Sequence, residues 1–130
     1  MANVTNNRPL SPHLQVYKLI PTMLMSIVHR ITGGALYFGT LLVVWWLVAA
    51  ATGQAYYDWV NWFMGTLIGR LVLFGYTWAL VHHMLGGLRH FVWDMGHGFE
   101  KHSTTRVARL MPVVSVILTV LIWAIGLIIR

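Results

Sequence analysis

Residues 110–129 read LMPVVSVILTVLIWAIGLII, an uncharged run bracketed by Arg109 and Arg130. A helix needs roughly 20 apolar residues to cross the hydrocarbon core of a bilayer, which is about 30 Å thick. Two further uncharged runs, at 31–52 and 71–88, are long enough to do the same. The sequence therefore predicts an all-α membrane protein with three transmembrane helices.

The composition supports a membrane protein. Of the 130 residues, 58% are hydrophobic and only 9% are charged, whereas soluble domains carry about 25% charged residues. The net charge of +6 would suggest nucleic acid in a soluble protein, but the apolar runs favour a lipid bilayer, and no nucleic-acid partner is expected. Because there is no cysteine, any metal must be held by nitrogen or oxygen.

We treat the chain as one membrane-anchor domain. The expected parts are an N-terminal arm at 1–21 and three spans at about 22–52, 67–90 and 109–130. The first helix is expected to start near Thr22, because Pro21 suits the first turn of a helix but not its interior. Residues 53–69 carry tyrosines and tryptophans, which favour the water–lipid boundary, so this connection is expected to lie along the membrane.

The basic residues predict the orientation of the spans. Three spans place seven of the nine on one side: Arg8, Lys18, Arg30, Arg89, Lys101, Arg106 and Arg109. Only Arg70 and Arg130 fall on the other side. Short basic segments stay cytoplasmic, which predicts a cytoplasmic N-terminus and a periplasmic C-terminus.

The first polar cluster within a span is Ser26-Ile27-Val28-His29-Arg30-Ile31-Thr32-Gly33-Gly34. On a helix, Ser26, Arg30 and Gly33 share one face, since they are spaced at i, i+4 and i+7. Polar side chains inside a membrane are costly and usually face other helices, a cofactor or water. The alternative is structural: Arg30 reaches lipid phosphate, and the glycines admit a neighbouring helix.

The second cluster, residues 82–94, reads HHMLGGLRHFVWD. His83, Gly87, His90 and Asp94 lie within a narrow sector of a helix. A neutral imidazole is an axial ligand for haem iron, and Gly87 would leave room for a flat macrocycle. Alternatively, the histidine bonds to another helix and the glycines only permit packing. Periodicity cannot choose between His83 and His82, which points about 100° away.

Basic side chains lie at the same end of both helices. His83 lies about 9 Å along the helix from Arg89 at 1.5 Å per residue, a depth that suits a haem with its iron in the membrane core and its propionates near the interface. His29, Arg30 and Arg89 could pair with those propionates.

These segments resemble the cytochrome b556 subunits of succinate dehydrogenase, the larger membrane anchors of respiratory complex II. The resemblance rests on three motifs in the same order: Arg8-Pro9-Leu10-Ser11-Pro12-His13-Leu14, the segment from Ser26 to Gly33, and the segment from His83 to Asp94. It covers essentially the whole chain, although the third span matches only in being apolar. The glycine pairs at 33–34 and 86–87 stand where family members often have one glycine.

The resemblance implies that His83, rather than His82, is the axial ligand, because it stands seven residues before His90 of the Gly-x-Arg-His element. It also implies a helical bundle shared with a second, smaller anchor subunit that supplies the other axial histidine. One haem b is then shared between the two subunits, and this chain has no catalytic residue of its own.

The resemblance assigns contacts with quinone to Ser26 and Arg30. It places His29 and His90 in the haem-propionate region, to which the spacing argument adds Arg89. The implied mechanism passes electrons from succinate through a flavoprotein subunit and an iron–sulfur subunit to ubiquinone, the substrate, in the citric acid cycle and respiratory chain. Ser26 would hydrogen-bond a quinone carbonyl, and Arg30 would stabilise the developing negative charge.

Two other functions remain open from the sequence. One is a fumarate reductase-type anchor that works in the opposite direction, and the other is a haem-free structural membrane anchor. The chain starts only seven residues before Arg8, without a transit peptide, which favours a bacterial inner membrane over a mitochondrial precursor.

Overall fold

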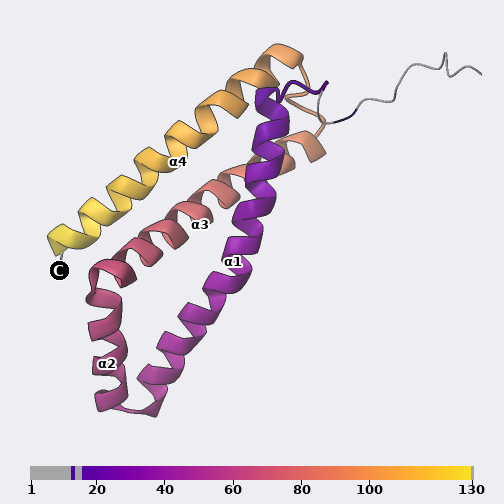
Figure 1. The fold of residues 1–130 in the computed structure, drawn as a ribbon. Helices are drawn as coiled ribbons and strands as arrows, with labels where there is room; N and C mark the ends of the chain where they lie inside the picture. Colours follow the sequence, from indigo (N-terminus) through magenta and orange to yellow (C-terminus); the bar gives the residue numbers. More distant parts are fainter. Residues whose placement is uncertain (1–12, 14–15, 130) are drawn as a thin grey trace, which may run out of the picture.

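The computed structural model describes residues 13 and 16–129, and within them it contains four helices and no strand (Figure 1). The helices are α1 (Pro21–Thr52), α2 (Gln54–Gly65), α3 (Leu67–Asp94) and α4 (Lys101–Ile129). Of these, α1, α3 and α4 are long and apolar enough to cross a membrane. This confirms the predicted all-α membrane protein with three spans. Most of the first sequence motif, residues 8–12 and 14, and also Arg130 lie outside the described residues.

Proline and glycine set the ends of α1. Ile20 has an extended backbone, and Pro21 occupies the first turn, where its missing N–H costs no helical hydrogen bond. The helix ends at Thr52 and is followed by Gly53, whose φ of 145° lies in a region that residues with a Cβ rarely adopt. Gly53 therefore allows the sharp change of direction from α1 to α2.

The short helix α2 joins the end of α1 to the start of α3 (Figure 1). Its Val60 and Met64 pack with Ala49 of α1 in a small apolar cluster. Trp59 and Trp62 remain exposed, as suits rings at a lipid–water boundary. The connection expected along the membrane is thus itself a helix. Thr66 follows α2, and its hydroxyl oxygen accepts a hydrogen bond from the Gly69 N–H and so caps the start of α3.

The start of α1, the end of α3 and the start of α4 lie together at one end of the bundle, which we call the polar end (Figure 1). Helix α3 packs against both α1 and α4. Most large apolar side chains are exposed, as expected for a lipid-facing surface. The largest fully buried side chains include four polar ones, which lie between the helices: His82, Thr32, Thr119 and Ser115.

Candidate functional site

The site residues predicted from the two clusters lie at the polar end, on the facing surfaces of α1 and α3. The ring of His29 on α1 stacks on the ring of His83 on α3, with centroids 4.0 Å apart and planes 12° apart. His90 lies about two turns after His83 on α3, and its ring centroid is 5.5 Å from that of His29. The two helices thus bring His29 next to two histidines that lie more than fifty residues further along the chain.

The hydrogen bonds of His83 define which ring nitrogen carries the proton. Its Nδ1 lies 3.1 Å from the backbone oxygen of His29. A carbonyl oxygen only accepts hydrogen bonds, so Nδ1 of neutral His83 must be the donor. The Nε2 atom is then left with a lone pair, the state in which an imidazole binds a metal. Histidine ligands in metal sites are commonly oriented by this kind of hydrogen bond.

Thr32 supports the same arrangement, although the sequence reasoning assigned it no role. Its hydroxyl donates to the His29 carbonyl oxygen at 2.9 Å, and its oxygen lies 3.4 Å from Nδ1 of His83. Thr32 is almost fully buried, with 1% of its surface exposed. The signal available in the sequence was a hydroxyl residue three positions after His29 in a mostly apolar segment.

Two glycines make the close contact of α1 and α3 possible. A Cβ added at Gly86 would overlap the His29 ring, and one added at Gly33 would lie 3.1 Å from Cε1 of His83. By contrast, a Cβ at Gly87 would meet no atom of the described chain within 4 Å. Gly86 therefore accommodates a histidine, while Gly87, one turn from His83, leaves open space beside α3.

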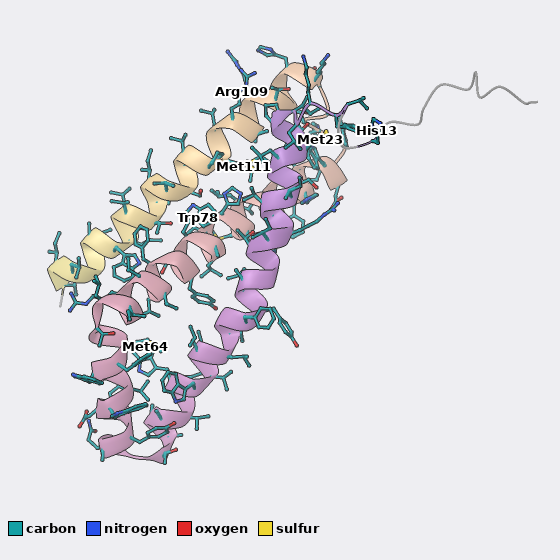
Figure 2. The ribbon with its side chains drawn as sticks, viewed as in Figure 1. His13, Met23, Met64, Trp78, Arg109 and Met111 are labelled. Atoms are coloured by element: carbon teal, nitrogen blue, oxygen red, sulfur yellow. The ribbon has the colours of Figure 1, made fainter. Side chains whose placement is uncertain are left out.

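A cavity of about 370 Å³ opens at the polar end between α1, α3 and α4. Five of its lining residues were predicted as site residues: Ser26, His29, Arg30, Arg89 and His90. Met111 of α4, labelled in Figure 2, closes one wall. His83 does not line this cavity but lies directly behind it, against the His29 ring.

Arg89 has a second set of contacts. Its Nη2 donates to the Thr104 carbonyl oxygen at 3.1 Å, and its guanidinium carbon lies 4.3 Å from the centre of the Trp93 ring. Trp93 in turn donates through Nε1 to the Gly98 carbonyl oxygen at 3.3 Å. Arg89 thus ties the end of α3 to the start of α4 while it borders the cavity.

His82 faces away from this site. It is fully buried against α4, and its Nδ1 lies 3.1 Å from the hydroxyl oxygen of Ser115. Periodicity alone could not distinguish the two adjacent histidines. The structure distinguishes them by the helix that each one contacts: His83 faces α1 and His82 faces α4.

The residues at the polar end fit a haem. His83 presents a lone pair at Nε2, and Gly87 leaves space beside it. Nε2 of His29 is buried against Gly86 and has no hydrogen-bond partner within the described chain. Across the described residues, no group of three or more His, Cys, Asp or Glu could chelate a bare metal ion. A haem needs only axial ligands from protein, because the macrocycle supplies the rest.

Comparison with known proteins identifies the family of the chain. The family model described as "Succinate dehydrogenase/Fumarate reductase transmembrane subunit" matches residues 4–122. The succinate dehydrogenase cytochrome b556 subunit of Paracoccus denitrificans is 44% identical over 122 residues, covering 93% of this chain and 94% of the relative. That of Rickettsia felis is 35% identical, covering 92% and 94%.

A eukaryotic relative extends the similarity. The mitochondrial cytochrome b560 subunit of Sus scrofa succinate dehydrogenase is 36% identical over 121 residues, covering 92% of this chain and 69% of the relative. The chain belongs to the family of transmembrane subunits of succinate dehydrogenase and fumarate reductase.

Proposed function

We propose that this chain is the membrane-anchoring cytochrome b subunit of a bacterial succinate dehydrogenase and that it supplies half of a haem b site and part of a ubiquinone site. The observation that carries the proposal is the hydrogen bond from Nδ1 of His83 to the His29 carbonyl oxygen, which leaves Nε2 free for iron. The relatives named above are succinate dehydrogenase subunits, which favours succinate oxidation over fumarate reduction.

His83 would be one axial ligand, and a histidine of the smaller anchor subunit would be the other. His29, Arg89 and His90 would contact the propionates, since all three border one cavity. Charge-assisted hydrogen bonds from such groups to a carboxylate are stronger than neutral ones. When bound, the haem would hold one electron near the quinone.

Ser26 and Arg30 would bind ubiquinone in the same cavity. Both are exposed side chains on α1, spaced by one helical turn. The Ser26 hydroxyl would donate to a quinone carbonyl oxygen, and the Arg30 guanidinium would stabilise negative charge on that oxygen as electrons arrive. The chain thus contributes binding groups and no catalysis on its own. The flavoprotein and iron–sulfur subunits would oxidise succinate and deliver the electrons.

The positions of the basic residues support an N-terminus in the cytoplasm of a bacterial cell and a C-terminus in the periplasm. In this orientation the polar end faces the cytoplasm. Ser26 and Arg30 would then lie on the side where the soluble subunits can dock.

The test uses the complete complex purified with all of its subunits. His83→Ala should abolish the b-type signal in the reduced-minus-oxidised spectrum and lower the pyridine-haemochrome yield, while the subunits stay together. His97→Ala, at an exposed loop position, is the matched control. A normal signal in an assembled His83→Ala complex would exclude His83 as the ligand. A wild-type complex without stoichiometric haem would instead favour a structural anchor.

A further inference from the structure

The interface of α3 and α4 contains a buried polar cluster that the proposed haem and quinone site does not use. Its members His82, Ser115 and Thr119 each have 0% of their surface exposed. Polar groups within a membrane span are costly unless they are paired and are often functional. None of these three residues lines the polar cavity.

The hydrogen bonds of Ser115 have defined directions. Its hydroxyl lies 2.9 Å from the carbonyl oxygen of Pro112, which can only accept, so the single hydroxyl proton is donated there. The 3.1 Å contact between Ser115 Oγ and His82 Nδ1 must then be donated by the ring. His82 is therefore held as the Nδ1–H form by a serine of another helix.

The other side of the His82 ring has no polar support. Its Nε2 is buried without a hydrogen-bond partner within the described chain, and so is Nε1 of Trp78. The indole of Trp78, which Figure 2 labels, lies one turn earlier on α3 and stacks on the His82 ring with centroids 5.3 Å apart and planes 29° apart. Among the residues that the structure describes, the bond to Ser115 is thus the one polar contact that sets the direction of this ring.

The contact between His82 and Ser115 lies near a proline in the interior of α4. Pro112, in its interior, lacks the N–H that would continue the helical hydrogen bonds, which loosens a helix locally. Ser115 lies three residues further on, and Thr119 donates to its backbone oxygen at 2.7 Å. The bond from His82 to Ser115 therefore joins α4 to α3 within one turn of Pro112.

Adjacent residues on a helix point about 100° apart. His82 and His83 accordingly contact different neighbours: Ser115 on α4 and the His29 carbonyl on α1. Any rotation of α3 that lengthens one of these hydrogen bonds also moves the other. The rotation of α3 thus bears on two hydrogen bonds made at consecutive residues.

We propose that His82 is a positioning residue: through its hydrogen bond to Ser115 it fixes the rotation of α3 and so directs His83 toward α1. The role of His83 as the haem ligand rests on the proposed function above. The contact between α3 and α4 does not.

The experiment compares four single variants in the assembled complex. Ser115→Ala and His82→Phe remove the hydrogen bond, whereas Ser115→Thr and His82→Asn keep a hydroxyl or an amide donor near the same place. The readouts are the low-temperature electron paramagnetic resonance of the oxidised haem and its midpoint potential, because a mere packing role would leave the axial geometry unchanged.

We expect shifted g-values and a shifted potential in Ser115→Ala and His82→Phe, with the wild-type signal restored in Ser115→Thr and His82→Asn. The double variant Ser115→Ala/His82→Phe should shift no further than either single one. Wild-type g-values and potential in both Ser115→Ala and His82→Phe would overturn the proposal. So would equal shifts in all four single variants.

A second measurement is independent of haem. Because the chain has no native cysteine, a His82→Cys/Ser115→Cys pair can be cross-linked by a short bis-methanethiosulfonate reagent within the complex. Efficient cross-linking, with none for Leu80→Cys/Ser115→Cys, supports the α3–α4 contact even if His83 is not the ligand. Leu80 is exposed on α3 and provides the matched control. Equal cross-linking of the two pairs would refute the contact and with it the proposal.

Discussion

His83 and His29 are joined twice: their rings stack at 4.0 Å, and Nδ1 of His83 donates to the His29 carbonyl oxygen at 3.1 Å. One histidine thus borders the polar cavity, while the other stands behind it with Nε2 unprotonated. The pair couples the orientation of His83, the proposed haem ligand, to the wall of the cavity in which we propose that quinone binds. A displacement of His29 is therefore expected to affect both functions.

Gly86→Ala should displace His29, because the new Cβ would overlap its ring. Overpacking of this kind costs about 1–3 kcal/mol. We expect a lower Tm of the complex and less haem per flavin. Gly75→Ala, on the same helix but with no atom of the described chain near its Cβ, should change stability by no more than about 1 kcal/mol. Equal haem content in both variants would contradict a role for the His29 ring.

Arg30→Lys should lower the rate of quinone reduction by roughly 100-fold if Arg30 stabilises charge on the quinone oxygen, because lysine lacks the planar fork of donors. Ser26→Ala should cost about 10-fold, as expected for one neutral hydrogen bond. Both variants should oxidise succinate normally with an artificial acceptor. Thr40→Ala removes a hydroxyl at an exposed position of the same helix and serves as the control. Parallel loss of both activities would point to faulty assembly.

Trp93→Leu should loosen the connection between α3 and α4, because it removes both the ring under Arg89 and the donor to the Gly98 carbonyl oxygen. A partly exposed cation–π contact contributes about 0.5–1 kcal/mol. Trp93→Phe keeps a ring and should have a smaller effect. Hydrogen exchange of the amides in residues 98–104 measures this, with about tenfold faster exchange expected in Trp93→Leu. Unchanged exchange in both variants would show that the contacts of Trp93 with Arg89 and Gly98 are not needed to order residues 98–104.

Single cysteines can test the orientation, because the chain has none of its own. Gln54→Cys, at the start of α2, should react with a membrane-impermeant maleimide in intact spheroplasts. His102→Cys, in the first turn of α4, should react only in inverted vesicles. Both positions are exposed in the structure. The reverse pattern of labelling would place the polar end in the periplasm and remove the support for docking of the soluble subunits there.

The amino-acid sequence by itself determined the three spans. A bilayer has a set thickness and excludes charge, so the number and length of uncharged runs are sufficient to count the helices that cross it. The sequence also determined the two ends of α1, because Pro21 and Gly53 act through the conformation of their own backbones. The same local chemistry picked out the two polar clusters, because polar residues are conspicuous in an apolar segment.

Only the tertiary structure decided what each polar residue contacts. Periodicity gives the angle between His82 and His83 but not which helix lies on either side. The packing of α1 and α4 against different faces of α3 assigns His83 to the His29 carbonyl and His82 to Ser115. The contact of Arg89 with Thr104 likewise depends on how the chain turns between α3 and α4. These pairings join residues distant along the chain, so no local pattern could contain them.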